Sequence, residues 1–355
     1  MFGRMMNNYY YGKSGKGDFR KDDLPETRMQ LFRDTLRTRL SGLCRLSMMY
    51  ALVWIPAMVV ILIYSGSMYS NLSLAAIVKE NDYASYVQMA QDAKQEVNVT
   101  EEDYNKLREA EFDVRGYLNQ NLFTMLLILF PCIAITGPCT AGISYVTRNW
   151  ARDEHAFIWT DFRDAVKANW KIPLLLSTIT GALPVLVYVG WTTYGQMAEN
   201  NAIMLIPRML VLLVGIIWSL AVTYMHPLTI TYDLKAMGVL RNGMLLGIAR
   251  LPFSVGIRLL HCVPALIAAG AVWFFGLDPV MALVLIGAYY IIIGFGLSRF
   301  VTASYTNAVF DRFINPQIEG AKVNQGLREK DDDEDEDAED EEGGTEEETA
   351  EKTEE

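Results

Sequence analysis

The chain has 355 residues, of which 51% are hydrophobic and 21% are charged, and its formal net charge at pH 7 is -11. Two soluble domains would fit this length, but the apolar residues are concentrated in blocks of about 20 to 25, the length that crosses a bilayer. We therefore expect one all-α membrane domain with polar additions. The acidity is local, because residues 331–355 contain 17 acidic residues and one lysine. The rest of the chain is net basic.

Four cysteines lie in or beside apolar segments and form no CxxC pair, namely Cys44, Cys132, Cys139 and Cys262. This pattern indicates neither a disulfide framework nor a zinc site, so we interpret them as small buried side chains. Residues 1–24 are polar and glycine-rich, which predicts a flexible basic arm and no cleavable signal peptide. The membrane domain is expected over residues 25–315.

An amphipathic helix and a first span open this domain. Apolar residues recur at helical spacing from Met29 to Leu43, with arginines at the other positions, which predicts a helix on the inner leaflet. A first span follows over about Leu46–Tyr64. Residues 67–118 then form a polar insertion, and helical patterns around 82–95 and 101–118, with Thr100 as a cap, predict a small helical hairpin outside the membrane.

The second span, about Leu122–Val146, contains Pro131, Gly137 and Pro138. Each proline removes a backbone donor inside the bilayer, so we expect a kinked or discontinuous helix. Residues 147–171 combine bases with an apolar stripe, which predicts a second helix on the inner leaflet.

Four further spans complete a six-span protein, and they are expected at about Ile172–Trp191, Ile203–Tyr224, Phe253–Phe275 and Val280–Val301. Bases are concentrated in the N-terminal arm and in residues 147–171 and 225–251, whereas the two short loops opposite contain none. The positive-inside rule therefore predicts that both termini are cytoplasmic and that 67–118 faces outward.

The even-numbered spans each loosen near the inner face, at Gly137-Pro138, at His226-Pro227 and at Gly294-Phe295-Gly296. The odd-numbered spans each contain a proline well inside. We interpret this as a threefold repetition of helix pairs, with Pro131, Gly137, Pro138, Pro227 and Gly294 as helix-break positions. In span six, the spacing of Gly287 and Gly294 predicts close helix packing.

Two blocks of sequence resemble one known family. The first block runs from Gly137-Pro138-Cys139-Thr140-Ala141 through Tyr145-Val146-Thr147-Arg148 and Asp161-Phe162 to Lys167-Ala168-Asn169-Trp170-Lys171. The second comprises His226-Pro227-Leu228 and the run Asn242-Gly243-Met244-Leu245-Leu246-Gly247-Ile248-Ala249-Arg250-Leu251-Pro252. They are similar to the YesL-like family of uncharacterised bacterial integral membrane proteins, over roughly residues 30–315. The resemblance implies a bacterial cell membrane and an association with carbohydrate uptake, but no catalytic residues. The 67–118 insertion and the acidic tail depart from the family.

The sequence offers little for catalysis. Its three histidines are separated by the predicted topology, no catalytic motif occurs, and the six spans contain no Asp or Glu, which argues against a proton relay. We therefore expect no enzyme, no cofactor, no metal site and no nucleic-acid partner.

Polar side chains within the spans are the candidate binding residues. Arg258 and His261 are three residues apart on one face of span five, where they can contact an anionic group or satisfy carbonyls freed by prolines. Tyr289 and Tyr290 can line a polar cavity or bond a neighbour. Arg208 and Arg299, near span ends, are expected to extend toward the membrane surface.

Two functions remain open at this point. We expect an accessory or interaction component near carbohydrate uptake, in contact with the lipid bilayer and with a sugar transporter or another membrane protein. The alternative is a permease for a small solute that uses the broken helices with Arg258 and His261. Residues 316–355 are expected to be a disordered cytoplasmic tail, either simply solvated or binding a basic partner.

Overall fold

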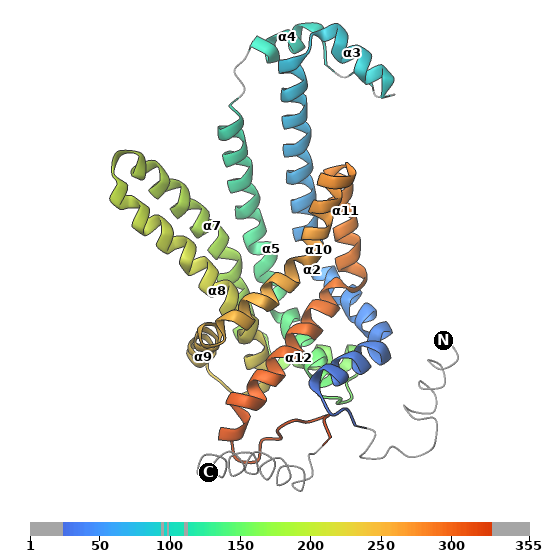
Figure 1. Cartoon of the computed structure of the whole chain (residues 1–355), viewed down its shortest axis with the longest axis vertical. Coiled ribbons are helices and arrows are strands. Elements are labelled where there is room, and N and C mark those ends of the chain that lie inside the picture. Colours follow the sequence, from blue (N-terminus) through green and yellow to red (C-terminus); the bar gives the residue numbers. More distant parts are fainter. Residues whose placement is uncertain (1–23, 94–95, 98, 110–112, 329–355) are drawn as a thin grey trace, which may run out of the picture. The chain divides into compact units, whose positions relative to one another are not determined.

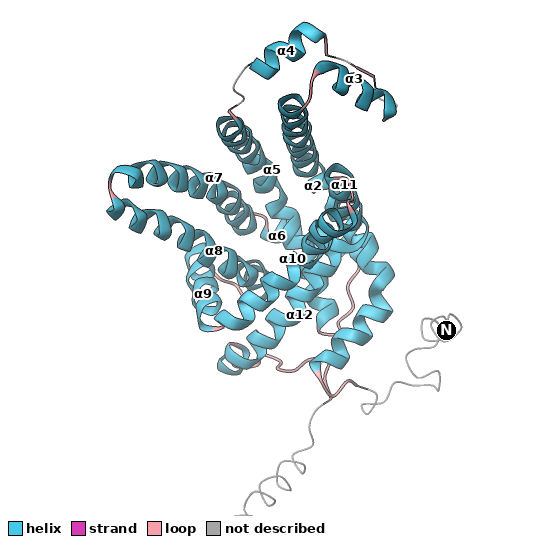
Figure 2. Ribbon diagram, turned by 45° about the horizontal axis from the view of Figure 1, so that its top comes forward, coloured by secondary structure: helices cyan, strands magenta, loops and turns pink. Residues whose placement is uncertain are grey.

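The computed structural model describes residues 24–93, 96–97, 99–109 and 113–328, and all regular secondary structure within these residues is helical (Figures 1 and 2). The predicted basic arm, except Leu24, and the acidic run 331–355 lie outside the described residues. Six helical segments in this part of the chain are long and apolar enough to cross a membrane, and their bounds are Arg28–Glu80, Val114–Ala151, Lys171–Asn200, Ala202–Thr231, Leu251–Phe275 and Pro279–Gln317. The predicted all-helical, multi-pass fold is confirmed.

The chain divides into two compact units. Within the described residues, the smaller unit comprises 24–40, 150–154 and 307–328, and the larger unit comprises 41–149 and 155–306. Helices α2 (Arg28–Glu80), α5 (Val114–Ala151) and α12 (Phe295–Phe313) each have residues in both units.

Helix α2 is longer than the sequence pattern indicated. The predicted amphipathic helix, the first span and the start of the polar insertion form one helix of 53 residues, which ends at Glu80. Residues 67–80 contain no proline or glycine, so nothing in their backbone chemistry stops the helix after the span. Helix α2 therefore includes the first residues of the polar insertion and ends later than predicted.

The insertion forms the predicted helical hairpin from α3 (Tyr83–Asp92) and α4 (Glu101–Glu109). Asp82 caps α3 by accepting a hydrogen bond from the Ser85 amide at 2.9 Å. At α4, the Thr100 hydroxyl accepts from the Asp103 amide at 3.3 Å and donates to the Asp103 carboxylate at 2.8 Å, which confirms Thr100 as the cap. The second helix is shorter than the predicted 101–118, because residues from Val114 onward belong to α5.

Tyr104 forms the core of this hairpin. Its side chain is fully buried, its ring lies 5.4 Å from that of Tyr83 and 5.2 Å from that of Tyr86, and its hydroxyl donates to the Asn81 carbonyl at 3.1 Å. Burial raises the pKa of the Tyr104 phenol. A single buried aromatic residue thus holds the two short helices together.

Helix α5 continues through Pro131 and Pro138, so of the two predicted forms, kinked or discontinuous, the discontinuous one is wrong. A proline removes one backbone hydrogen bond, and neighbouring helices can compensate for that loss. Gly137 has a packing role instead, because a Cβ there would lie 2.7 Å from the Leu174 Cα. The absence of a side chain lets α5 approach the start of α7 (Lys171–Asn200).

The amphipathic helix predicted after span two is α6 (Ile158–Asn169). It packs against α5 at Gly142, where a Cβ would lie 2.7 Å from the ring of Phe162. Helix α7 then pairs with α8 (Leu205–Thr231), and α9 (Ala236–Ala249) packs on α8 within the predicted inner segment. A Cβ on Gly247 would lie 3.1 Å from the Ala221 Cα, so α9 needs a glycine there.

The final helix pair is joined by a tight turn. Helix α10 (Leu251–Phe275) ends at Gly276, which has a φ of 65°, and Asp278 caps α11 (Pro279–Tyr289) through the Met281 amide at 2.9 Å. A π-helical turn, η3 (Tyr290–Gly294), separates α11 from α12. The helix therefore loosens at the predicted Gly294, and the Ser47 hydroxyl donates to the Tyr290 carbonyl at 2.9 Å.

The close packing predicted for Gly287 and Gly294 is found at Gly296. A Cβ on Gly287 would meet nothing within 4 Å, and one on Gly294 would meet the rings of the preceding tyrosines. A Cβ on Gly296 would lie 2.5 Å from the Leu43 carbonyl oxygen, so α12 touches the α2 backbone there.

The smaller unit corrects the predicted tail boundary. Asp311 is buried and bonds to Arg28, which also donates to the Asn324 side chain at 2.8 Å. The Arg328 amide donates to the Pro25 carbonyl at 3.0 Å. Residues 316–328 thus pack beside the start of α2, although their sequence contains few apolar residues.

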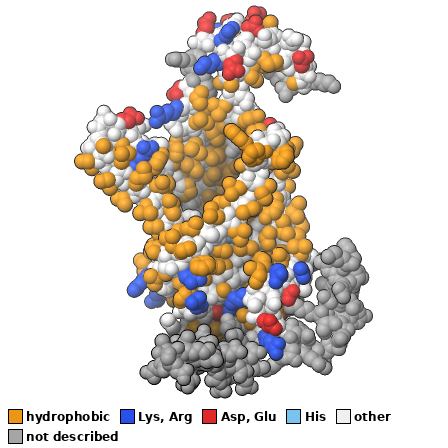
Figure 3. All heavy atoms as spheres, in the orientation of Figure 1, with side chains coloured by type: hydrophobic (Ala, Val, Ile, Leu, Met, Phe, Trp, Pro, Cys, Tyr) orange, Lys and Arg blue, Asp and Glu red, His pale blue; other side chains and the backbone are white. Residues whose placement is uncertain are grey.

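Most of the apolar helix surface is not covered by the chain itself. In the most apolar window of each span, the buried share ranges from 0% in α10 to 28% in α2. Hydrophobic side chains accordingly cover the helices of the larger unit in the space-filling view (Figure 3). Such exposure is expected of helices whose surroundings are lipid or other membrane helices.

Candidate functional site

Three helices of the larger unit, α8, α10 and α12, share a hydrogen-bonded polar core. The Tyr224 hydroxyl lies 2.7 Å from the Ser254 hydroxyl and 2.7 Å from the Tyr305 hydroxyl. Tyr224 and Ser254 are fully buried, and Ser254 also donates to the Arg250 carbonyl at 3.0 Å. These bonds place one residue from each of the three helices in a single contact.

A second contact joins α10 to α12 further along α10. The His261 Nε2 lies 3.2 Å from the Ser298 carbonyl oxygen and 3.3 Å from the Thr302 hydroxyl, which itself donates to the Ser298 carbonyl at 2.9 Å. The imidazole therefore sits against the helix backbone, in an orientation fixed by two partners.

Two arginines and a further histidine lie near this contact. The guanidinium groups of Arg258 and Arg299 are close enough to interact electrostatically with each other, with His261 and with His226 of α8. His226 is only 5% exposed. We call His226, Arg258, His261 and Arg299 the basic cluster.

The basic cluster contains buried polar atoms without partners. The Arg258 Nε and the His226 Nδ1 are both buried, and neither has a hydrogen-bond partner among the described residues. Helices α8, α10 and α11 contain no Asp or Glu, and Asp311 of α12 is bonded to Arg28. No carboxylate in these helices neutralises the two guanidinium groups.

Like charges that are partly buried without a counter-ion are unfavourable, so the basic cluster favours an anionic group. A guanidinium offers donors in a fixed fork that matches the oxygens of a carboxylate or a phosphate. Ionisable side chains at membrane depth usually mark a functional site. The arrangement is therefore suited to binding an anion.

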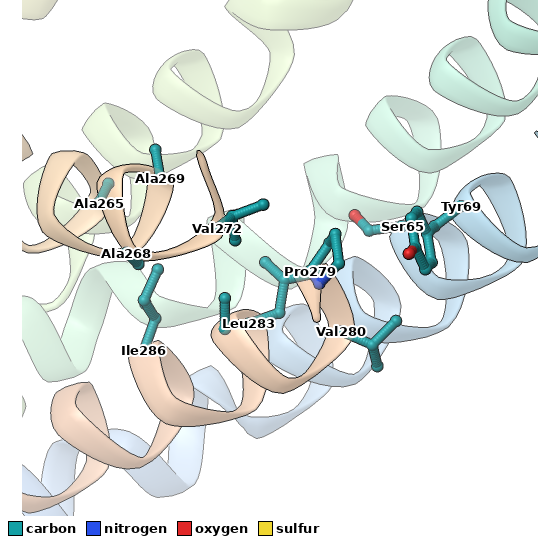
Figure 4. Close-up of a pocket in the computed structure, with 11 residues that line it drawn as sticks. Ser65, Tyr69, Ala265, Ala268, Ala269, Val272, Pro279, Val280, Leu283 and Ile286 are labelled. Atoms are coloured by element: carbon teal, nitrogen blue, oxygen red, sulfur yellow. The ribbon is translucent and has the colours of Figure 1, made fainter. Parts of the chain in front are cut away.

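A crevice of about 320 Å³ lies between α2, α10 and α11 (Figure 4). Its lining is almost entirely apolar and contains several small side chains. The residues are Ser65, Tyr69, Ala265, Ala268, Ala269, Val272, Pro279, Val280, Ala282, Leu283 and Ile286. It contains no catalytic constellation.

The structure brings the predicted pair Arg258 and His261 together and adds two residues to them. Arg299, which the sequence placed near a span end, belongs to the basic cluster. Arg208 does not, because its guanidinium lies 3.9 Å from the centre of the Trp191 ring. The sequence placed His226 near the inner face of span four. Its proximity to Arg258 and Arg299 in the folded chain makes it part of the basic cluster.

The other predicted site residues lie outside the basic cluster. Tyr289 and Tyr290 have their rings 5.3 Å apart, and Tyr290 also packs against Phe295 at 5.3 Å. Pro227 follows His226 inside the uninterrupted helix α8, so the predicted break there is wrong. The ring contacts of Tyr289 and Tyr290 and the position of Pro227 therefore add no ligand-binding group to the basic cluster.

Sequence reasoning missed Tyr224, Tyr305 and Thr302 as parts of the polar core. The available signal was their position: each is a hydroxyl side chain inside a long apolar helix. Among the residues that the structure describes, no group of three or more His, Cys, Asp or Glu side chains is arranged to hold a metal ion.

Comparison with known proteins gives one partial match. Residues 117–191 match the model of a family described as "Protein of unknown function, DUF624". This stretch covers most of α5, all of α6 and the first two thirds of α7, and therefore includes the first of the two sequence blocks, from Gly137 to Lys171. No curated protein and no solved structure matches the chain.

Proposed function

We propose that this chain is an accessory component of the bacterial cell membrane that associates with a transporter for carbohydrate uptake. Two similarities support the proposal: the match of residues 117–191 to a family of unknown function and the YesL-like resemblance of the two inner segments. Under this proposal both termini are cytoplasmic and the α3–α4 hairpin is extracellular, in accordance with the distribution of bases.

The observation that carries the proposal is the low burial of the helices. The chain itself buries none of the most apolar window of α10 and 6% of that window in the α8 span. Such faces suit lateral contact with other membrane helices as well as with lipid. In α7 and α9, the glycines Gly190, Gly195 and Gly247 lie close to residues of α8, so the exposed faces of these helices lie on other sides.

Affinity purification of the full chain from native membranes in a mild detergent tests this role. We expect a membrane transport protein to co-purify in a fixed ratio and to be lost when a bulky polar residue is placed on the exposed α10 face, as in Ile267→Gln. A matched change on a buried face, Ala221→Gln, controls for unfolding. Purification of the chain alone under these conditions would contradict the accessory role.

A permease for a small solute is the second candidate, and the basic cluster is the observation that favours it. Charged groups at membrane depth often line the path of a solute. Liposomes that contain only this chain provide the test. Uptake of a sugar, an oligosaccharide or a small anion at the rate of empty liposomes would exclude the permease.

A further inference from the structure

Helix α10 carries one continuous stripe that changes from basic to apolar. Arg258, His261, Ala265, Ala268 and Val272 follow one another at intervals of three and four residues, so they share one face of the helix. The first two belong to the basic cluster, and the last three line the crevice. The two features are therefore successive parts of one helix face.

Helix α11 has a matching stripe. Leu283 and Ile286 line the crevice, and Tyr290 follows Ile286 by one helical turn at the start of η3. Beyond that turn the same chain reaches Ser298 and Arg299, which meet α10 at the basic cluster. From the crevice toward the basic cluster, both helices thus change from apolar to polar in the same direction.

The space in the crevice arises from small side chains. Ala265, Ala268 and Ala269 contribute only methyl groups to the lining, and Val272 and Leu283 complete the walls (Figure 4). The crevice is almost free of polar groups, so it would favour a hydrocarbon chain over a sugar. Ser65 and Tyr69 of α2 provide the hydroxyl groups at its edge.

The positively charged groups at the other end of the stripe favour the binding of an anion. The basic cluster contains two guanidinium groups, the unpartnered Arg258 Nε and the unpartnered His226 Nδ1, without a nearby carboxylate from α8, α10 or α11. The phosphate of a phospholipid offers two charged acceptor oxygens, so it can accept from two guanidinium groups at once.

The distances along α10 fit an amphiphile. With a rise of about 1.5 Å per residue, the crevice residues from Ala265 to Val272 lie about 10 to 21 Å from Arg258 along the helix. The hydrocarbon of one bilayer leaflet is about 15 Å deep, which reaches Ala265 and Ala268, whereas Val272 lies beyond it.

We propose that the basic cluster and the crevice together bind one anionic phospholipid, with its phosphate at Arg258 and Arg299 and one acyl chain along Ala265 and Ala268. This site does not depend on the accessory role proposed above. The bound lipid would fill the space between α2, α10 and α11 and neutralise the arginines, so it acts as a structural ligand of the membrane domain.

Native mass spectrometry of the purified full chain provides the test. The probes are phosphatidylglycerol, phosphatidylcholine with the same acyl chains, and inorganic phosphate. We expect phosphatidylglycerol to be retained about tenfold more strongly than phosphatidylcholine, because both carry a phosphodiester but the choline cation of phosphatidylcholine is repelled by the two arginines. Arg258→Gln combined with Arg299→Gln should remove this preference, whereas Arg208→Gln should leave it unchanged.

A second pair of variants tests the crevice. Ala268→Phe fills the space between α10 and α11 and should lower the retention of phosphatidylglycerol severalfold. Leu266→Phe, at a position that is 62% exposed on the same helix, is the matched control and should have no effect. Thermal unfolding of every variant shows which of them fold. If the double variant does not fold, Arg258→Lys replaces it, because lysine keeps the positive charge but lacks the forked donors of the guanidinium group.

Two results would overturn the proposal. Equal retention of phosphatidylglycerol and phosphatidylcholine by the unmodified chain would show that the basic cluster does not select an anionic headgroup. Binding of inorganic phosphate that depends on Arg258, together with an unchanged lipid preference in Ala268→Phe, would assign the basic cluster to a soluble anion instead. That second outcome would favour the permease and leave the accessory role untouched.

Discussion

The hydroxyl groups of Tyr224 and Tyr305 lie 2.7 Å apart, 81 residues from each other in the chain, and join α8 to α12. The same Tyr224 hydroxyl bonds to Ser254 of α10. The Tyr224 hydroxyl oxygen therefore connects the three helices that carry the basic cluster. The geometry of the basic cluster depends on the relative positions of these helices.

Replacing Tyr224 by Phe should lower the free energy of unfolding by about 1 kcal/mol, because hydrogen bonds between membrane helices contribute about that much. Tyr305→Phe should have a smaller effect, since Tyr224 keeps its bond to Ser254. Reversible unfolding in mixed micelles measures both variants and the double variant. Strictly additive effects in this cycle would contradict a direct bond between the two hydroxyl groups.

Gly296→Ala should destabilise the membrane domain by about 1 to 3 kcal/mol, because its Cβ would lie 2.5 Å from the Leu43 carbonyl oxygen. Gly287→Ala is the matched control, since a Cβ there meets nothing within 4 Å. Alanine favours helix over glycine by about 1 kcal/mol, so the control should be neutral or slightly stabilising. Equal melting temperatures for the two variants would show that α2 and α12 are not in close contact.

Asp311→Ala should release the segment 317–328, because Asp311 is the buried partner of Arg28 and also accepts from the Asn324 amide at 3.3 Å. Removing one member of a buried pair leaves the other charge without a partner and is strongly destabilising. Limited proteolysis should cleave this segment faster in the variant. Glu102→Gln, at the exposed pair with Lys106, is the control and should leave the cleavage rate unchanged.

Tyr104→Ala should unfold the α3–α4 hairpin at a cost of about 3 to 5 kcal/mol, since the ring fills the whole core of this small structure. The six spans do not depend on it. We therefore expect rapid proteolysis between residues 81 and 113, while the melting temperature of the membrane domain stays unchanged. A hairpin that remains resistant would show that other contacts hold it together.

Acid should weaken the start of α3. Hydrogen bonds from Ser85, through its side chain and its backbone amide, lower the pKa of Asp82 below its ordinary value of 3.8. A lowered folded pKa means that the stabilisation is complete above 3.8 and is lost as the pH falls through the folded value. Hydrogen exchange at the Ser85 amide should accelerate in that range. In Asp82→Ala it should be fast already at pH 6, and an identical pH profile in both proteins would contradict the cap.

The six spans could be predicted because a run of about 20 apolar residues has only one stable conformation in a bilayer, a helix that satisfies its own backbone. The turn at Gly276 was also predictable, since a short loop with glycine and proline between two apolar runs has few solutions. The continuity of α5 through Pro131 and Pro138 could not be predicted from the sequence. Whether a proline interrupts a helix depends on the neighbouring helices, which a single sequence does not reveal.

The candidate site was only half predictable. Arg258 and His261 are three residues apart, so their common face follows from helix geometry alone. Arg299 and His226 lie on other helices, and only tertiary packing brings them near Arg258. The ordered segment 316–328 was missed for a related reason: polar hydrogen bonds to Arg28 and Arg152 fix it, and they leave no hydrophobic pattern.

The most direct test of the central claim is an electron cryo-microscopy map of the full chain in nanodiscs that contain phosphatidylglycerol. A bound anionic phospholipid predicts headgroup density between Arg258 and Arg299 that continues as an acyl chain along Ala265 and Ala268. The same density should be absent in the Arg258→Gln, Arg299→Gln variant. An empty basic cluster in the unmodified chain, or an Asp or Glu side chain paired with both arginines, would contradict the account.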